Sequence, residues 1–124
     1  MKTIIMQDPV PEALGSRFPQ VNVTAQEAEQ ICADLGGRLP TSEEYDRFFA
    51  QSPWPHLVWE WTSTLKGPGR RVVRGGAWNF PSKNARASDR DVFDPSFRID
   101  GVGFRCARNV PDDAVVPEGW EVLK

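Results

Sequence analysis

The sequence predicts a single α+β domain of 124 residues, in which two helices pack on small antiparallel sheets joined by long irregular loops. Two capping-box motifs predict the helices, and short alternating apolar segments predict the strands. The third observation is a polar stretch between Arg74-Gly75-Gly76-Ala77-Trp78 and Gly101-Val102-Gly103-Phe104-Arg105-Cys106. It is rich in Arg, Asp, Asn and aromatic residues but lacks helix or strand periodicity. Because long irregular loops in compact domains are usually functional, we expect the functional residues there.

The first half of the chain contains one predicted strand and both predicted helices. Residues 3–6 form a short apolar strand, which the prolines that follow it terminate. Thr24 and Glu27 have capping-box spacing, so a helix begins there, and its apolar stripe turns Cys32 toward the core before Gly36-Gly37 ends it. The same spacing recurs over residues 41–44 and predicts a second, shorter helix ending near Ser52-Pro53.

The second half contains a predicted hairpin, a last strand and a tail. Residues 58–62 alternate as a strand, a Gly-Pro-Gly turn follows, and residues 71–74 return, with Gly75-Gly76 allowing a kink or bulge. A last strand runs from Val102 to Arg108 and turns Cys106 toward the core. The tail over residues 110–124 is expected to be an extended arm, with Val115, Val116 and Trp120 available to dock it.

Composition and charge exclude several classes of protein. The net charge of −2 and a pI near 5.4 argue against a bulk electrostatic role on nucleic acid or membranes. Arginines are frequent from Arg70 to Arg108, but four aspartates are interleaved with them. No apolar run reaches the about 20 residues of a membrane span, and residues 1–6 do not form a secretory signal. We therefore expect a soluble protein, in the cytoplasm or in a phage particle.

Most of the individual reactive residues favour a structural interpretation. His56 is the only histidine, which excludes a His-rich metal site. Cys–His catalysis needs a cysteine outside the core, and both cysteines are predicted to face it, as two buried thiols or one disulfide. Loop carboxylates lack calcium-loop spacing and are expected to be solvated. The tryptophans at strand spacing are expected in the core rather than stacked on a ligand.

The arginines of the polar stretch allow two interpretations. Guanidinium groups suit anionic ligands, but a long loop also has many backbone carbonyls that need donors. We favour the second interpretation, which leaves the aromatic and acidic residues of the loop as the better candidates for contact with a partner.

Several motifs together resemble the formylglycine-generating enzyme (sulfatase-modifying factor) superfamily, whose domain is a variant of the C-type lectin fold. They occur in family order over about residues 19–108, and they are Pro19-Gln20-Val21-Asn22-Val23-Thr24, Leu35-Gly36-Gly37-Arg38-Leu39-Pro40-Thr41, Val58-Trp59-Glu60-Trp61-Thr62-Ser63, Arg71-Val72-Val73-Arg74-Gly75-Gly76-Ala77-Trp78 and Gly103-Phe104-Arg105-Cys106. The resemblance implies a minimal C-type lectin-like domain over residues 19–108, preceded by a strand and linker (1–18) and followed by the extended arm (109–124).

The resemblance also carries expectations for individual residues. It implies that Cys32 and Cys106 occupy positions that form a disulfide in some members, and that Glu60 matches a calcium-binding glutamate. The family's enzymes oxidise a substrate cysteine with copper held by two thiolates, and the matching positions here are Phe80 and Ala85. Since soft thiolates select Cu(I), this pattern argues against formylglycine generation and against catalysis by this chain, leaving a metal-dependent oxidase as a third, less favoured alternative.

The pattern is similar to a non-catalytic branch with the same scaffold, the ligand-binding variable proteins of diversity-generating retroelements and related phage proteins. In those proteins the segment between the two glycine-rich anchors displays the binding residues. The expected contact residues here are Phe80, Ser82, Lys83, Ser88, Asp89, Asp91, Phe93, Phe97 and Ile99, and the expected scaffold residues are Arg74, Trp78, Arg86, Arg90, Arg98 and Arg105.

These observations favour a non-catalytic, lectin-like binding or display module that recognises a protein or glycan through the 79–100 loop. A structural or assembly subunit, for example of a phage virion, is the alternative, because the shortened N-terminal region suggests that another chain or a second copy covers part of the core. We expect no cofactor, with Glu60 as a weak candidate for calcium, and no nucleic-acid or membrane partner.

Overall fold

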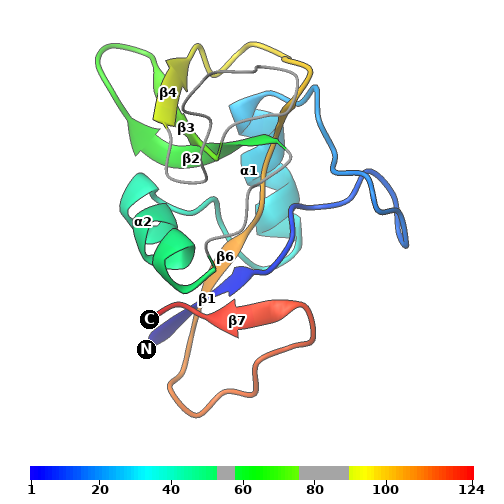
Figure 1. Cartoon of the computed structure of the whole chain (residues 1–124), viewed down its shortest axis with the longest axis vertical. Coiled ribbons are helices and arrows are strands. Elements are labelled where there is room, and N and C mark those ends of the chain that lie inside the picture. Colours follow the sequence, from blue (N-terminus) through cyan, green and yellow to red (C-terminus); the bar gives the residue numbers. More distant parts are fainter. Residues whose placement is uncertain (53–57, 76–89) are drawn as a thin grey trace.

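The computed structural model describes residues 1–52, 58–75 and 90–124, with only the backbone described for residues 90–92. In chain order the elements are β1 (Lys2–Met6), α1 (Ala25–Asp34), α2 (Ser42–Gln51), β2 (Trp59–Leu65), β3 (Arg71–Arg74), β4 (Arg90–Phe93), β5 (Val102–Gly103), β6 (Ala107–Val110) and β7 (Trp120–Val122). The two helices flank the β2–β3 hairpin, and the sheet containing β1 lies below them in Figure 1. The predicted α+β class is confirmed.

Both predicted helices and their capping boxes are present. The Thr24 hydroxyl accepts a hydrogen bond from the Glu27 backbone N–H at 3.1 Å, and the Glu27 carboxylate accepts one from the Thr24 N–H at 2.8 Å. Thr41 and Glu44 repeat this exchange at 3.0 and 2.9 Å. Since such caps contribute about 1 kcal/mol each, local sequence fixes where the two helices begin.

Two small sheets build the domain. The first has the order β6-β1-β7 and is antiparallel, and the second has the order β4-β3-β2-β5. The expectation of purely antiparallel sheets is wrong at one pair, because β5 lies parallel to β2, with Trp59 opposite Val102. The chain reaches β5 through the long segment after β4, and this crossover allows the parallel direction.

The predicted last strand over residues 102–108 is divided between the two sheets. β5 pairs with β2, whereas β6 pairs with β1, so the chain changes sheet at residues 104–106. There, the Val10 N–H donates to the Phe104 carbonyl at 2.9 Å and the Met6 N–H donates to the Cys106 carbonyl at 3.1 Å. The expectation of one continuous strand is wrong because the first part of this segment pairs with β2 and the last part pairs with β1.

The predicted irregular segment contains a strand. β4 pairs with β3 over four residues, from Arg71 opposite Phe93 to Arg74 opposite Arg90. β3 has one edge on β2, so its other edge was available for this pairing. Gly75, where we expected a kink or bulge, lies in a bend with a φ of +109°, and Gly76 lies outside the described residues. A separate irregularity lies in β2, where the register with β3 shifts between Trp61 and Leu65.

The tail forms an edge strand rather than an extended arm. β7 pairs with β1, and Leu123 after it is only 6% exposed. The side chain of Gln51 at the end of α2 donates to the Val122 carbonyl at 2.8 Å and accepts from the Lys124 N–H at 2.8 Å, so it covers the outer edge of β7. The two chain ends, 1–18 and 109–124, therefore supply strands of one sheet, and Val115 remains 91% exposed.

The core contains the residues that the apolar patterns predict. Trp61 and Cys32 are fully buried and Trp59 is nearly so, in a cluster that joins α1 to the larger sheet. A second cluster, around Tyr45 and Phe48, joins α2 to the smaller sheet. No helix in the described part of the chain has the length and apolar character needed to cross a membrane.

Candidate functional site

Arg74, at the start of the polar stretch, is a buried anchor. It lies at the end of β3, and its guanidinium donates to the carbonyl and the hydroxyl of Ser42 at 2.7 and 2.8 Å and to the Asp46 carboxylate at 2.6 Å. The ring of Phe49 lies 5.4 Å from the guanidinium carbon. Arg74 therefore ties the end of β3 to the first turns of α2.

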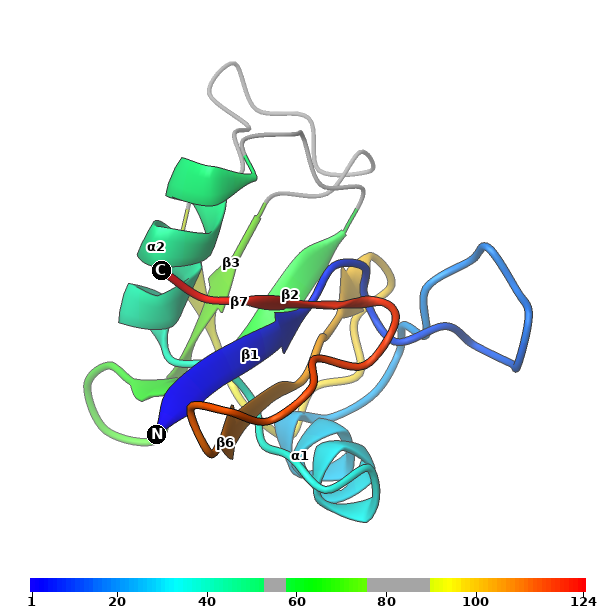
Figure 2. The ribbon, with the colours of Figure 1, turned by 90° about the horizontal axis from the view of Figure 1, so that it is seen from below.

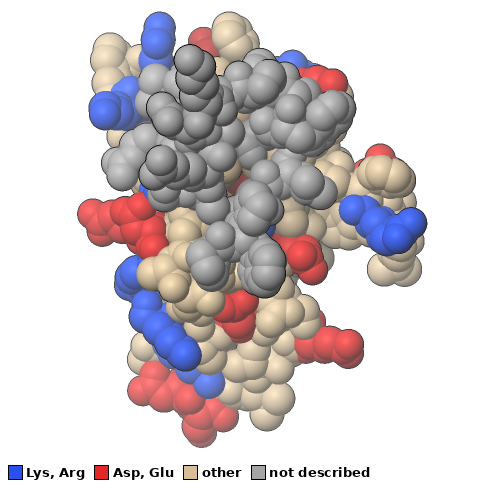
Figure 3. Space-filling view, viewed as in Figure 1, with Lys and Arg blue, Asp and Glu red and all other residues tan. Residues whose placement is uncertain are grey.

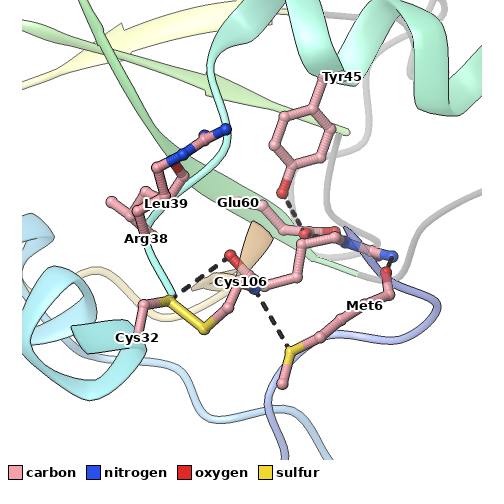
Figure 4. The surroundings of a disulfide bond; sticks show 8 residues. Met6, Cys32, Arg38, Leu39, Tyr45, Glu60 and Cys106 are labelled. Carbon is pink, nitrogen blue, oxygen red and sulfur yellow. Dashed lines mark hydrogen bonds and ion pairs between the residues drawn. A yellow bond between two sulfur atoms is a disulfide. The ribbon is translucent and has the colours of Figure 1, made fainter. Parts of the chain in front are cut away.

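Arg105, after the polar stretch, is the second anchor and is fully buried with its partner Glu60 on β2. Its Nε and Nη2 atoms donate to the two oxygens of Glu60 at 2.5 and 2.9 Å, and Nη1 donates to the carbonyls of Met6 and Gln7 at 2.8 Å each. The Tyr45 hydroxyl donates a hydrogen bond to the same carboxylate (Figure 4). Because Met6 ends β1 and Glu60 lies on β2, Arg105 connects the two sheets.

Burial and charge set the protonation of this cluster. Burial and the negative charge of Glu60 together raise the pKa of Tyr45 well above its ordinary value of 10.0. Burial disfavours the charged form of Arg105, but the adjacent Glu60 carboxylate outweighs that effect and raises the pKa of Arg105. The cluster is therefore an ion pair with a neutral tyrosine beside it, an arrangement that supports structure rather than proton transfer.

The hydrogen bonds of Glu60 decide whether this residue could bind calcium, as the resemblance implied. Both carboxylate oxygens already accept hydrogen bonds from a guanidinium that would repel a second cation. Among the described residues, no three His, Cys, Asp or Glu side chains gather as a metal site. The donor set around Glu60 does not fit calcium.

The state of the two cysteines decides whether they could hold copper, as thiolates do in the enzymes that the chain resembles. The structure joins Cys32 of α1 to Cys106 in a disulfide with an S–S distance of 2.14 Å, the pairing that the resemblance implied (Figure 4). The chain has only these two cysteines. Neither presents a thiolate, and Phe80 and Ala85 occupy the positions that match the copper ligands, so the residues of this chain do not fit a thiolate-held copper.

The described end of the polar stretch, residues 93–100, lies against the beginning of α1. The Ala25 N–H donates to the Pro95 carbonyl at 2.9 Å, and the Asn22 N–H donates to the Ile99 carbonyl at 3.3 Å. Arg98 and Glu27 form an ion pair at 2.7 Å. The hydrogen bond from the Thr24 N–H, followed by this ion pair, lowers the pKa of Glu27.

The predicted contact residues in this part differ in exposure. Phe97 is 54% exposed, whereas Phe93 and Ile99 are half-buried and pack against the main core cluster. Phe97 is therefore free to meet a partner, and Phe93 and Ile99 also serve the core. The predicted scaffold residues Arg74, Arg98 and Arg105 all make ion pairs. Arg74 and Arg105 also donate to backbone carbonyls, but these belong to Ser42, Met6 and Gln7, outside the polar stretch.

The other predicted site residues lie outside the described part of the chain. These are the contact residues Phe80, Ser82, Lys83, Ser88 and Asp89, the scaffold residues Trp78 and Arg86, and the side chains of Arg90 and Asp91. His56 also lies there.

Sequence reasoning missed an open cleft of about 770 Å³ beside Arg105. Its walls come from residues 6–9 and 11 at the end of β1 and after it, from residues 16–19 and from residues 118–120 at the start of β7, and Ser52 and Arg105 complete the lining. The signal that could have indicated it is Leu14 and Phe18, two apolar residues in a polar region that is bounded by Pro11 and Pro19.

Charge is distributed evenly over the visible face of the molecule. Acidic and basic side chains alternate over the described part of that face in Figure 3 rather than forming an area of one sign. On the described part of this face, the distribution agrees with the near-neutral composition.

Two of three comparisons with known proteins find a similarity. Residues 57–110 match the family described as Sulfatase-modifying factor enzyme 1-like domain, a range that includes Glu60, Arg74 and Arg105. The comparison with curated proteins finds no match. Among solved structures, the chain is similar to PvdO from Pseudomonas aeruginosa, with 19% sequence identity and a TM-score of 0.61. The similarity covers 77% of this chain and 64% of the PvdO chain, so it spans less than two thirds of PvdO. The chain thus has a fold similar to that of PvdO, and residues 57–110 carry the similarity to the sulfatase-modifying factor family that the motifs predicted.

Proposed function

We propose that this chain is a non-catalytic recognition module, which binds a protein or glycan through residues 79–100. The observation that carries the proposal is the loss of the superfamily's thiol chemistry on a scaffold that is otherwise retained. Both cysteines are bonded to each other, and Phe80 and Ala85 stand at the matching copper positions. A chain that keeps the anchors but lacks the reactive groups is suited to binding.

The anchors support this proposal because they fix both ends of the segment. Arg74 and Arg105 are 0% exposed, and each makes at least three hydrogen bonds to groups on other elements. Moving either end would break buried charge-assisted hydrogen bonds, which are costly to lose. A segment with fixed ends loses less conformational entropy when it binds a partner.

Phe97 is the described residue best placed to contact a ligand. It is exposed, and the backbone on both sides of it is held by α1 through the hydrogen bonds at Pro95 and Ile99. Exposed aromatic side chains on a rigid base are frequent binding hot spots, since they bury a large area with few rotatable bonds. The proposed surface includes Phe97 together with the other expected contact residues of the segment.

The test is a parallel screen of the oxidised full chain against a glycan array and a displayed random-peptide library. Ligands that are recovered should bind Phe97→Ala about tenfold or more weakly than wild type. Leu65→Ala is the matched control, because Leu65 is 65% exposed and lies on β2, outside the proposed surface. Ligands that bind Phe97→Ala as tightly as wild type, or a screen that recovers none, would overturn the proposal.

A structural or assembly subunit is the second candidate function. The exposed apolar side chains Leu14 and Phe18 favour it, since exposed apolar groups on a projecting loop are typical of protein contacts. Membership of the diversity-generating retroelement or phage branch is part of the leading proposal. A neighbouring reverse transcriptase gene with a template repeat would support that branch, and flanking capsid or tail genes would support assembly.

A further inference from the structure

Residues 11–19 form an ordered excursion, here called the 11–19 hairpin, that projects from the body of the molecule (Figures 1 and 2). Pro11 and Pro19 pair across its base, and the Glu12 N–H donates to the Phe18 carbonyl at 2.9 Å. The turn at its tip is closed by a hydrogen bond from the Ser16 N–H to the Ala13 carbonyl at 3.0 Å, and Gly15 has a φ of +80°. This backbone is defined by its own hydrogen bonds although few other residues surround it.

The tip of the 11–19 hairpin is apolar and uncovered. Leu14 is as exposed as it would be in an extended chain, and Phe18 is 68% exposed. A single exposed leucine is ordinary, but two apolar side chains on a projecting, ordered hairpin expose apolar area that folding alone does not require.

The cleft of about 770 Å³ lies at the base of the same hairpin. Its apolar lining includes Pro9, Phe18 and Trp120, and its size falls within the about 300–1,000 Å³ typical of binding pockets. Its floor is fixed, because Arg105 holds the carbonyls of Met6 and Gln7 and the Gln7 N–H donates to the Gly119 carbonyl at 2.9 Å.

Besides the buried Arg105, three charged residues line this cleft, Asp8, Arg17 and Glu118. Asp8 and Glu118 are exposed, as is Arg17. Within the described part of the chain, none of the three forms an ion pair. The cleft thus combines an apolar lining with acidic and basic groups that are available to a partner.

We propose that the cleft receives the tip of the 11–19 hairpin from a second copy of this chain, which gives a two-fold symmetric dimer. Leu14 of each copy enters the apolar part of the other copy's cleft, and Arg17 of each copy faces Asp8 and Glu118 of the other. A second copy fits because a two-fold interface needs a protrusion and a complementary recess side by side on one molecule, and this chain has both. The hairpin cannot fill its own cleft, since its base forms one wall of that cleft and its tip is exposed.

Leu14 and the described residues that line the cleft do not belong to the 79–100 segment. Dimerisation through the hairpin and ligand binding through Phe97 are therefore tested by separate experiments, and the failure of one proposal does not decide the other.

Sedimentation velocity of the oxidised full chain over a concentration series tests the dimer. Wild type should shift from monomer to dimer as concentration rises, and Leu14→Asp should raise the dimer dissociation constant about tenfold or more. Val115→Asp is the matched control, because Val115 is also an exposed apolar residue but lies outside the cleft, so this variant should dimerise like wild type. Circular dichroism verifies that both variants are folded.

A charge exchange identifies the contact. Arg17→Glu should weaken the dimer, and the double variant Arg17→Glu/Glu118→Arg should restore it in part, because opposite charges then face each other again. A wild-type chain that remains monomeric throughout the series would overturn the proposal. So would Leu14→Asp dimerising as tightly as wild type, or open-ended association beyond a dimer.

Discussion

Substitution of Glu60 by glutamine perturbs the buried cluster that connects the two sheets. Glutamine has nearly the same shape as glutamate but no charge, so the change leaves the Arg105 guanidinium buried without a counter-ion. Both side chains are 0% exposed, and their two hydrogen bonds measure 2.5 and 2.9 Å. The expected cost follows from this geometry.

Removing one partner of a buried ion pair destabilises a protein by about 3–5 kcal/mol. The glutamine oxygen can still accept one hydrogen bond from Arg105, so we expect a loss near the lower end, about 3 kcal/mol. Tyr45→Phe removes only one hydrogen bond to the same carboxylate, and the expected loss is smaller, about 1–2 kcal/mol. A domain of 124 residues has about 6–19 kcal/mol of total stability, so both losses are measurable.

Urea denaturation of the oxidised chain, followed by tryptophan fluorescence, measures these losses. Trp61 is a suitable reporter because it is fully buried and its indole N–H donates to the Val23 carbonyl at 2.9 Å. Glu43→Gln, on the exposed side of α2, is the control and should change stability little. A loss below about 1 kcal/mol for Glu60→Gln would match a surface ion pair and refute the reasoning.

Three other measurements test further parts of the structure. Tyr45 is the only tyrosine, and because its pKa is raised in the folded chain, its contribution to stability is complete below about pH 10 and decreases above it. Tyrosinate absorbance should therefore appear only when circular dichroism shows that the chain unfolds. Tyrosinate absorbance near pH 10 in a folded chain would contradict the burial of Tyr45. The double variant Cys32→Ser/Cys106→Ser should lower the free energy of unfolding by about 4.5 kcal/mol, because the disulfide joins residues that are 74 positions apart. An unchanged urea midpoint would show that the disulfide does not contribute to stability. Burial raises the pKa of Glu44, but Arg38 and the Thr41 N–H outweigh it and hold this pKa below 4.5. The free energy of unfolding of the wild type should therefore decrease as the pH falls below about 4.5. This decrease with pH should be shallower in Glu44→Gln than in Glu43→Gln, and equal slopes in the two variants would contradict the prediction.

Local signals account for what the sequence predicted well. The capping boxes at Thr24 and Thr41 act within four residues, so their pattern is sufficient to place both helix starts. The β2–β3 hairpin is similarly local, since a short Gly-Pro-Gly turn joins its strands. In each case the residues that determine the element are neighbours in the chain.

Long-range pairing accounts for what the sequence did not predict. β4 and β7 are four and three residues long, too short for a periodic pattern, and they form because β3 and β1 offer them an edge. The division of residues 102–108 between two sheets likewise depends on strands elsewhere in the chain.

The candidate site shows the same division. The family motifs identified Arg74 and Arg105 as scaffold residues, but no spacing in the sequence connects them to their partners. Arg74 binds Ser42 and Asp46 of α2, and Arg105 binds the carbonyls of Met6 and Gln7. The cleft at the 11–19 hairpin was missed because its walls come from parts of the chain that lie far apart in the sequence.

The central claim is that this chain has a fold similar to that of the sulfatase-modifying factor proteins but lacks the thiolates that hold copper in their enzymes. Titration of Cu(I) into the oxidised full chain, in competition with a chromophoric Cu(I) chelator, tests this claim most directly. Because the two cysteines are bonded to each other, we expect the chelator to keep the copper at every ratio. Uptake of one equivalent of Cu(I) per chain, at an affinity that competes with the chelator, would contradict the account.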